Sequence, residues 1–303
     1  MGESAHVRGI LTLRLTALEF PREYATLFPG PRLGVEGFRK HNNVYGRPVL
    51  MGPLRPEVGF SPEQYADVAY QAYLGGADMV KDDELLVDPR YCPIKRRARA
   101  CADAARRAED HTGLRKTFFL NIGTDLTRFA ERMEVGHQAG VDGFMVHPRM
   151  TPSLLTYARS LTALPIIAHY EFVTVCTKPV GAGIDFPVMG QLYRAAGADI
   201  ITMPRPNPRF DISSHEYVRN LRACFEPLGN TAAACPAPTG GNTPADVYEV
   251  YELIRRPDYV FVSGSAMFED RDGITAGSKK LRDAIAGLER HLSGATKPEA
   301  RRA

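Results

Sequence analysis

The sequence predicts an α/β protein built as a (β/α)8 TIM barrel, and three observations favour this fold. The chain has 303 residues, of which 44% are hydrophobic, so it can bury a sizeable core. Eight short apolar runs rich in β-branched residues alternate with eight segments of helical periodicity. Several of the helical segments end in a glycine followed closely by an aspartate. An open doubly wound sheet is the alternative, but such sheets usually stop at about six strands.

The predicted strands and helices follow one another as crossover units from residue 49 onward. Strands are expected at 49–54, 77–80, 117–122, 143–147, 165–169, 199–203, 231–236 and 259–263. Helices are expected at 61–75, 94–110, 125–139, 152–161, 186–196, 213–225, 243–255 and 273–291. Because a helix connects each strand to the next, the strands should be parallel.

Capping residues and helix endings mark the boundaries of these units. Capping pairs open four helices, namely Ser61-Pro62, Thr124-Asp125, Thr151-Pro152 and Thr243-Pro244. Four strands follow the endings GGAD (75–78), AGVD (139–142), AGAD (196–199) and RPD (256–258). Glycine is expected in the left-handed position after the helix, and the acidic residue opens the next strand.

Two short segments flank the predicted barrel. Residues 1–48 form a lead-in expected to pack on the barrel (49–291), and 292–303 is predicted to be a flexible tail.

Net charge, apolar runs and cysteines indicate the class of protein and its compartment. The net charge of +3 comes from 38 scattered basic and 35 acidic residues, so neither nucleic acid nor a membrane surface is predicted as a partner, while a small anionic substrate is compatible with this charge. No apolar run reaches about 20 residues and no signal peptide is recognisable, so a cytoplasmic protein is predicted. Five cysteines without a CxxC pair fit a reducing compartment, and Cys176, Cys224 and Cys235 are expected to be buried packing residues.

In a TIM barrel the active site lies at the carboxyl-terminal ends of the strands. The polar residues predicted there are Arg55, Lys81-Asp82-Asp83-Glu84, Asn121, His147, His169, Thr202, Thr239-Gly240-Gly241 and Ser263-Gly264-Ser265. The segment Lys81-Asp82-Asp83-Glu84 is the strongest signal, although a solvated charged loop is the alternative interpretation. Carboxylates at a strand end suit Mg²⁺, and a lysine with a depressed pKa can act as a nucleophile or add carbon dioxide to become an anionic carbamate.

The segment GGADMVKDDELLVDPRYCP, residues 75–93, resembles the metal-site segment of the ribulose bisphosphate carboxylase (RuBisCO) superfamily. The resemblance runs from about residue 12 to 291 and includes YGRPVLMGPLRPEVGFSPE (45–63), FFLNIG (118–123), PIIAH (165–169), GIDFPVMGQLYRAAGADII (183–201) and PAPTGG (236–241). It implies a TIM barrel in which carbamylated Lys81, Asp83 and Glu84 bind Mg²⁺. The later segments look more like RuBisCO-like proteins than the carboxylases.

Departures from the family pattern argue against carboxylation of ribulose bisphosphate. The first strand ends at Arg55, where the family usually has the lysine of a KPxxG motif; Arg55 is either an electrophilic helper or an ion-pair partner of Glu57. Tyr170 follows His169 where the carboxylases have a substrate-binding arginine. The sixth loop, residues 204–210, lacks the carboxylase's lysine, although Arg205 or Arg209 could face an acidic substrate.

The remaining candidates are assigned to proton transfer and to anion binding. His169 is predicted to transfer protons or contact substrate rather than to be a core histidine, and His147 is a weaker candidate. Asn121 is expected to hydrogen-bond near the metal. The two strand-end loops with Thr239, Gly240, Gly241, Ser263, Gly264 and Ser265 are expected to bind an anion, with two tight turns as the alternative.

The sequence therefore predicts a Mg²⁺-dependent RuBisCO-like enzyme acting through an enediolate on a small phosphorylated or carboxylated keto compound. Isomerisation, tautomerisation and decarboxylation all remain open. The alternative is a non-catalytic barrel subunit that retains a relic metal motif. Family members generally carry an N-terminal α/β domain before the barrel, so the resemblance implies a homodimer or a complex with a separate chain supplying that domain, or else a truncated chain.

Overall fold

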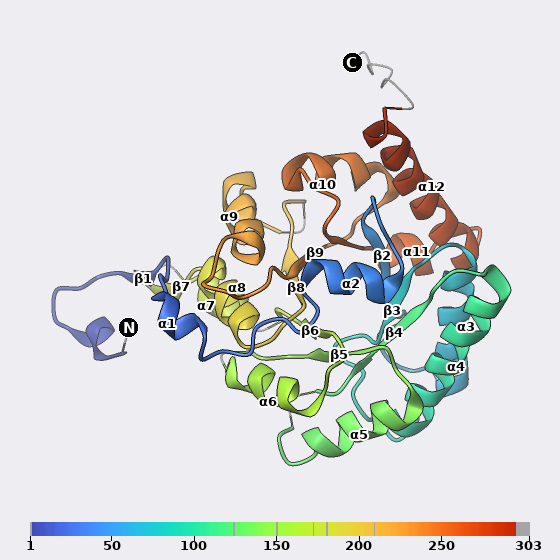
Figure 1. Cartoon of the computed structure of the whole chain (residues 1–303), viewed down its shortest axis with the longest axis horizontal. Coiled ribbons are helices and arrows are strands. Elements are labelled where there is room, and N and C mark those ends of the chain that lie inside the picture. The colour runs from blue at the N-terminus through green and yellow to red at the C-terminus, as the bar shows by residue number, and fades with distance from the viewer. Residues whose placement is uncertain are drawn as a thin grey trace.

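The computed structural model describes residues 2–123, 125–149, 151–171, 173–179, 181–208 and 210–294. Eight parallel strands form one sheet in the order β10-β2-β3-β4-β5-β6-β8-β9, surrounded by helices (Figure 1). The strands are β2 (Val49–Pro53), β3 (Met79–Lys81), β4 (Thr117–Asn121), β5 (Gly143–Val146), β6 (Ile166–Ala168), β8 (Ile200–Pro204), β9 (Cys235–Thr239) and β10 (Val260–Val262). The predicted α/β barrel class is confirmed.

The helices that connect the strands lie close to their predicted ranges. They are α3 (Pro62–Leu74), α4 (Ile94–Thr112), α5 (Phe129–Ala139), α6 (Ser153–Leu161), α8 (Phe186–Ala195), α9 (Ser214–Phe225), α10 (Val247–Ile254) and α12 (Ile274–Leu292). A 3-10 turn, η2 (Pro244–Asp246), precedes α10. Helix α5 begins four residues later than predicted, because residues 125–128 form a turn in which Asp125 Oδ1 accepts the Thr127 N–H at 3.0 Å.

The glycine–aspartate endings have a common structural role. The glycines after α3, α5 and α8 have φ of +114° (Gly76), +71° (Gly140) and +118° (Gly197), as predicted for helix C-termini. Each following aspartate accepts an N–H from the first or second residue of the preceding strand: Asp78 from Leu50 at 2.9 Å, Asp142 from Phe118 at 2.9 Å and Asp199 from Ile166 at 3.0 Å. These repeated bonds set the register of neighbouring strands at the amino-terminal end of the barrel.

Strand β9 is displaced from its predicted range, which was 231–236. Residues 231–234 instead form the preceding loop, where the Arg194 guanidinium binds the carbonyls of Thr231 and Ala232 at 2.8 and 2.7 Å. The strand runs on through Pro236 and Pro238, two residues that normally argue against a central strand. The predicted start was wrong because the apolar residues 232–234 belong to a loop, in which Ala232 is exposed and Ala234 is buried.

The prolines also explain the seam of the barrel, the place where the first and last strands in the sheet order, β10 and β9, lie side by side without a regular hydrogen-bond ladder. Cys235 donates its N–H to Asp199 O on the β8 side at 2.8 Å, and successive residues of a strand face alternate sides, so Pro236 and Pro238 face β10. Proline has no N–H to donate. The side chain of Asn242 substitutes for the missing ladder, since its Nδ2 donates to Pro238 O at 2.9 Å and to Val262 O at 2.7 Å.

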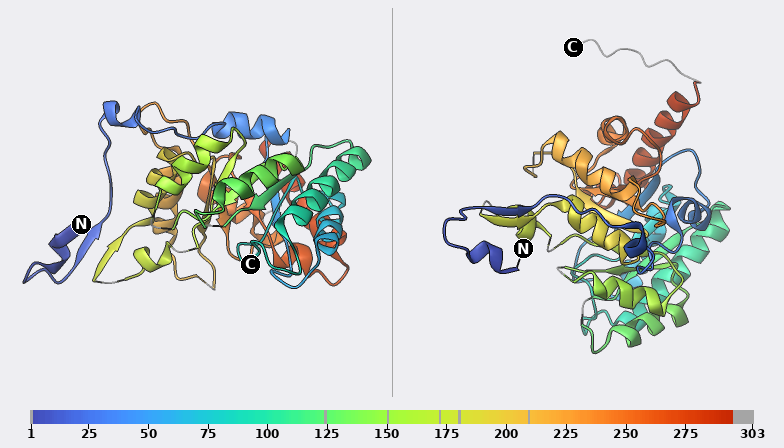
Figure 2. Two further views of the ribbon diagram at one scale, coloured as in Figure 1. Left: turned by 90° about the horizontal axis from the view of Figure 1, so that it is seen from below. Right: turned by 60° about the vertical axis from the view of Figure 1, so that its left-hand side comes forward.

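The lead-in divides into two parts. Helix α2 (Gly34–Asn42) covers the amino-terminal end of the barrel, where Phe38 joins the apolar side chains of the barrel interior. Earlier residues form η1 (Gly2–His6), β1 (Leu13–Leu15) and α1 (Arg22–Ala25). Strand β1 pairs in parallel with β7 (Ala182–Ile184), and this two-stranded sheet projects from the body of the molecule (Figure 2). The sequence analysis predicted neither strand.

Two short helices, α7 (Thr174–Thr177) and α11 (Ser265–Phe268), complete the described elements. All five cysteines are buried and unpaired, in agreement with the predicted packing role of Cys176, Cys224 and Cys235. Burial raises the pKa of the Cys224 thiol to about 12, so this thiol is not a reactive nucleophile at neutral pH. Within the described part of the chain, every helix is too short or too polar to cross a bilayer.

Candidate active site

Polar side chains gather in a pocket of about 210 Å³ at the carboxyl-terminal ends of the barrel strands. Of the residues predicted from the sequence, the pocket is lined by Arg55, Lys81, Glu84, His169, Thr239, Gly240, Gly241, Gly264 and Ser265. Asp83, Asn121 and Ser263 are fully buried in the neighbouring strand ends, and Arg209 lies outside the described residues. The barrel thus brings together side chains that are up to about 200 residues apart in the sequence.

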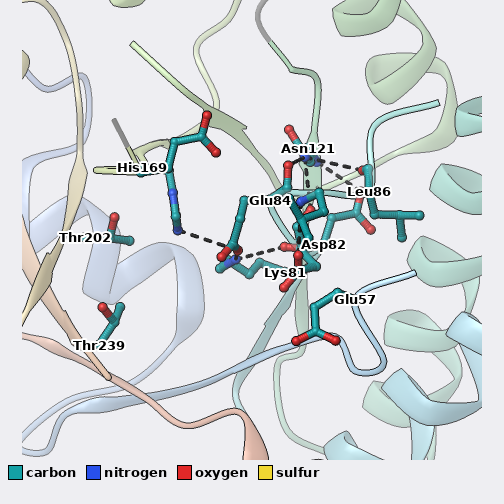
Figure 3. Close-up of polar contacts among 12 residues, drawn as sticks. Glu57, Lys81, Asp82, Glu84, Leu86, Asn121, His169, Thr202 and Thr239 are labelled. Atoms are coloured by element: carbon teal, nitrogen blue, oxygen red, sulfur yellow. Dashed lines mark hydrogen bonds and ion pairs between the residues drawn. The ribbon is translucent and has the colours of Figure 1, made fainter. Parts of the chain in front are cut away.

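Lys81 and Glu84 form the centre of this pocket. Lys81 is the last residue of β3 and is 2% exposed. Its Nζ donates to Asp82 O at 3.0 Å and to Glu84 Oε2 at 3.3 Å (Figure 3). Burial opposes ionisation of Glu84, but the charge of Lys81 outweighs it and holds the pKa of this carboxyl well below its usual range. Glu84 is therefore an anion aimed at an amine in a largely dehydrated site.

Asp82 belongs to the framework rather than to the pocket. Its carboxylate oxygens both lie 3.1 Å from Arg97 Nε on α4, and both side chains are 0% exposed. Oδ2 also accepts the Asn121 N–H at 3.0 Å. Asp82 thus ties β3, β4 and α4 together and leaves Asp83 and Glu84 as the acidic residues beside Lys81.

Arg55 lines the same pocket from the strand next to Lys81, two residues after the end of β2. Its Nη1 donates to Asp83 Oδ2 and lies 3.2 Å from Glu57 Oε1. Burial raises the pKa of Asp83 despite the nearby Lys81. Both interpretations of Arg55 are therefore compatible with its place: it lines the pocket, and it is an ion-pair partner of Glu57 as well as of Asp83.

His169 faces Glu84 from the end of β6. Its Nε2 lies 3.7 Å from Glu84 Oε2, too far for a hydrogen bond, and the residue is 6% exposed (Figure 3). Burial, together with the charge of Lys81, lowers the pKa of His169 well below its ordinary value. The ring is therefore neutral at pH 7 and can accept a proton only if a bound group changes its surroundings.

Asn121, the last residue of β4, fixes the backbone of Asp83 and Glu84. Its Nδ2 donates to Asp83 O and to Glu84 O, both at 3.0 Å. Its Oδ1 accepts the Gly123 N–H at 2.9 Å and lies 3.1 Å from His147 Nε2. The predicted role near the metal motif is consistent with these contacts, which fix the backbone that carries the two carboxylates.

The loops after β9 and β10 form the opposite side of the pocket. Gly240 has φ of +116°, and a Cβ there would come within 2.5 Å of the Phe210 ring, so the site requires glycine. Asn207 Nδ2 donates to Gly240 O at 2.9 Å, which links this loop to the one after β8. Ser263 does not face the pocket, because its Oγ donates to Asn242 O at 2.7 Å.

Arg205 corrects one of the predictions for the sixth loop. It is 4% exposed, and its Nη2 pairs with Asp246 Oδ1 at 2.6 Å at the start of α10. Its Nε donates to Asn242 Oδ1. Because the guanidinium is used by these structural contacts, Arg205 is not placed to bind an acidic substrate.

Sequence reasoning missed several residues that shape the site. Phe210 lines the pocket from the sixth loop, and Tyr170, which the sequence analysis named only as the replacement of an arginine, lines it as well and stacks on His169 with ring centroids 5.3 Å apart. Neither aromatic carries a motif, but both follow predicted strand ends. Arg97 and Asn242 were also missed, because their roles depend on distant partners: Asp82 lies 15 residues from Arg97, and Val262 lies 20 residues from Asn242. Glu171, two residues after His169, lies 3.0 Å from His147 Nδ1 through its Oε2.

Fold and pocket define a (β/α)8 barrel with a lysine–carboxylate motif at the carboxyl-terminal mouth, and comparisons with known proteins identify the family. The sequence model of the ribulose bisphosphate carboxylase large chain, catalytic domain, matches residues 34–205. The ribulose bisphosphate carboxylase-like protein 2 of Rhodopseudomonas palustris is 34% identical over 282 residues, which are 92% of this chain and 65% of that protein. The chain therefore belongs to the RuBisCO large-chain family.

Solved structures agree with this assignment. A RuBisCO-like protein from Burkholderia fungorum superposes with a TM-score of 0.86 at 27% identity, covering 94% of this chain and 70% of that one. The octameric RuBisCO of Pyrococcus horikoshii gives a TM-score of 0.90 at 28% identity over 97% and 69% of the two chains. This chain spans just under two thirds, 65%, of the length of the R. palustris relative.

Proposed function

We propose that the protein is a Mg²⁺-dependent RuBisCO-like enzyme that forms an enediolate or enolate from a small phosphorylated or carboxylated keto compound. The reaction would be an isomerisation or tautomerisation, or a decarboxylation, rather than carboxylation of ribulose bisphosphate. The observation that carries the proposal is the Lys81 amine, 2% exposed and 3.3 Å from Glu84 Oε2, in the pocket at the carboxyl-terminal ends of the strands.

The donor set suits Mg²⁺. Addition of carbon dioxide to the neutral Lys81 amine would release one proton and give an anionic carbamate, which together with Asp83 and Glu84 makes three hard oxygen donors. When bound, Mg²⁺ would polarise a substrate carbonyl and its neighbouring hydroxyl.

The chain's own residues supply proton transfer and orientation. Neutral His169, with Nε2 directed toward Glu84, is suited to take a proton from the carbon next to a carbonyl. The Lys81 carbamate is the other candidate base. Arg55 cannot act as a base, since its guanidinium stays protonated, but it lines the pocket and can stabilise a developing enolate oxygen.

The opposite side of the pocket supports an anionic group on the substrate. Gly240, Gly241 and Gly264 carry no side chains there, and Ser265 lines the pocket with a hydroxyl that donates to Glu269 Oε1 at 3.2 Å. Backbone N–H groups freed by glycine bind phosphate or carboxylate oxygens well. Tyr170 and Phe210 also line the pocket and limit it to a small substrate. Tyr170 stands where the carboxylases have a substrate-binding arginine, so no arginine at that position is available for a second phosphate.

Calorimetric titration of the full chain with MgCl₂ in bicarbonate buffer tests the metal motif. Saturable binding is expected for the wild type and should be lost in Lys81→Ala, whereas Lys95→Ala, an exposed lysine of α4, should behave as the wild type. In parallel, ¹³C-labelled bicarbonate should give a carbamate signal in NMR spectra of the wild type only. Absence of both binding and carbamate in the wild type would refute the proposal.

Enolisation can be tested without knowing the final product. Small phosphorylated and carboxylated keto compounds are incubated with the loaded protein in D₂O, and exchange of the carbon-bound hydrogen is followed by ¹H NMR. Exchange is expected with at least one of them and should fall at least 100-fold in Lys81→Ala, a loss typical of removing a base or metal ligand. Exchange equal to that of the buffer for all compounds would contradict the enzyme proposal.

The second candidate is a non-catalytic barrel that binds a metabolite or a partner chain. One observation favours it: Arg55 neutralises Asp83, and Lys81 neutralises Glu84, so the charges balance without a metal. Persistence of these ion pairs in a crystal grown with Mg²⁺ and bicarbonate would support this candidate. Under either proposal we expect the chain to form a homodimer or a complex with a separate chain equivalent to the N-terminal domain. Light scattering measures the mass of the assembly.

A further inference from the structure

A second group of metal-ligating side chains lies beside the Lys81–Glu84 pair. His147 follows β5, His169 follows β6, and Glu171 comes two residues later. One donor atom from each of these three residues lies within 4.8 Å of the other two. The rings of His147 and His169 have centroids 5.2 Å apart. Neither Asp83 nor Lys81 is part of this group.

Asn121 determines which ring nitrogen of His147 carries the hydrogen. The amide of Asn121 is oriented by its other contacts, since Nδ2 donates to two carbonyls and Oδ1 accepts the Gly123 N–H. His147 Nε2, 3.1 Å from that Oδ1, must therefore carry the hydrogen. In the neutral ring, Nδ1 then presents a lone pair to Glu171 Oε2 at 3.0 Å. Two acceptors at this distance need a cation between them, either a proton or a metal ion.

His169 distinguishes between the two cations. It is 6% exposed, and its Nδ1 is a buried atom without a hydrogen-bond partner within the described structure. A proton shared by His147 and Glu171 would leave that nitrogen without a hydrogen-bond partner. A metal ion bound by all three residues would instead use the second imidazole as a ligand.

We propose that His147, His169 and Glu171 bind a divalent transition-metal ion of the Zn²⁺ class, at a site separate from the Mg²⁺ motif. Two imidazoles and one carboxylate form a donor set that Zn²⁺ prefers and that leaves a coordination position open for water or substrate. Mg²⁺ prefers oxygen donors, so the two sites differ in selectivity.

The surroundings fit such a site. Asn121 would hold the distal nitrogen of the His147 ligand, the arrangement that usually orients metal-bound histidines. Arg149 Nη2 lies 3.6 Å from Glu171 Oε1, so it positions the carboxylate while Oε2 faces His147. The Glu171 side chain is 29% exposed and gives an ion access from solvent. This proposal goes beyond the proposed enolisation and does not depend on a carbamate. With the ion bound, His169 is a ligand, and the Lys81 carbamate is then the base of the proposed enolisation.

Co²⁺ provides a spectroscopic test. The full chain is stripped with a chelator, desalted and titrated with CoCl₂ alone, and the visible d–d absorption is followed. One equivalent of saturable absorption is expected, and ZnCl₂ should displace it. Glu171→Gln should weaken Co²⁺ binding at least tenfold, whereas Glu131→Gln, an exposed carboxylate on α5, should leave it unchanged. Circular dichroism checks that each variant is folded.

A cross-comparison separates this site from the Mg²⁺ motif. Asp83→Asn should abolish the heat of Mg²⁺ binding in bicarbonate and retain the Co²⁺ spectrum. Glu171→Gln should retain the heat of Mg²⁺ binding and weaken the Co²⁺ spectrum. The proposal is overturned if the wild type gives no saturable Co²⁺ spectrum. It is equally overturned if the spectrum survives Glu171→Gln and is lost in Asp83→Asn, because the metal would then occupy the first motif.

Discussion

At the scale of single residues, the two adjacent aspartates of the acidic segment have different partners and different roles. Asp82 is enclosed by Arg97 and by the Asn121 N–H, whereas Asp83 contacts Arg55 beside the pocket. The sequence predicted that the segment would lie at a strand end, and its charge pattern could not separate the two residues. The distinction depends on Arg97, which comes from the next helix and carries no motif.

Replacement of Arg97 by alanine should destabilise the fold strongly. The change leaves Asp82 as a buried carboxylate without its ion-pair partner, and loss of one partner in such a pair typically costs about 3–5 kcal/mol. Urea unfolding followed by circular dichroism measures the free energy of unfolding. Arg96→Ala is the matched control, because Arg96 is the neighbouring residue on α4 and pairs with Glu63 at the surface; it should cost less than about 1 kcal/mol. Equal losses in the two variants would contradict the assignment of Asp82 to the framework.

Replacement of Arg55 by alanine should tighten Mg²⁺ binding in bicarbonate buffer. The guanidinium competes with a metal ion for Asp83, so its removal should lower the dissociation constant by about tenfold, equivalent to about 1.4 kcal/mol. Calorimetry measures the change. Glu57→Gln, which removes the more exposed partner of Arg55 and leaves its contact with Asp83, should change the affinity less. Weaker binding in Arg55→Ala would indicate that Arg55 positions Asp83 for the metal.

At the scale of secondary structure, the parallel strands were predictable because each buried strand is a short apolar run. Strand β9 is the exception, since Pro236 and Pro238 are compatible with a barrel strand only where their missing N–H groups face a partly unpaired neighbour. The side chain that compensates, Asn242, follows a loop of two glycines, and nothing in its local sequence distinguishes it from an ordinary turn residue.

Asn242→Ala should therefore destabilise the barrel at its seam. The variant leaves the carbonyls of Pro238 and Val262 and the Nε of Arg205 without partners in the interior, and we expect a loss of about 2–4 kcal/mol. Thermal and urea unfolding measure this loss, and hydrogen exchange should locate it at β9 and β10. Asn230→Ala, at an exposed turn before β9, serves as the control and should stay within about 0.5 kcal/mol of the wild type. A neutral Asn242→Ala variant would mean that the backbone closes the seam unaided.

At the scale of the whole molecule, the lead-in could be predicted only as a segment that packs on the barrel. Helix α2 places Phe38 among the interior side chains of the barrel, including Met51, Met79 and Phe119, so residues 34–48 are part of the same core. The two-stranded sheet of β1 and β7 joins segments about 170 residues apart, and three-residue strands give no periodic pattern from which to predict it. The barrel was predictable because its repeated units are local, whereas these contacts are not.

Phe38→Ala tests whether α2 is an integral cover of the barrel. Phe38 is 1% exposed, and its truncation should leave a cavity at the amino-terminal end of the barrel and cost about 3–5 kcal/mol of the free energy of unfolding. Phe28→Ala is the matched control, because Phe28 is 37% exposed in the earlier part of the lead-in and should lose less than about 1 kcal/mol. A single cooperative transition at lower urea concentration is expected for Phe38→Ala. An unchanged midpoint would show that the interior closes without α2, so that the barrel core would begin at β2 rather than at residue 34.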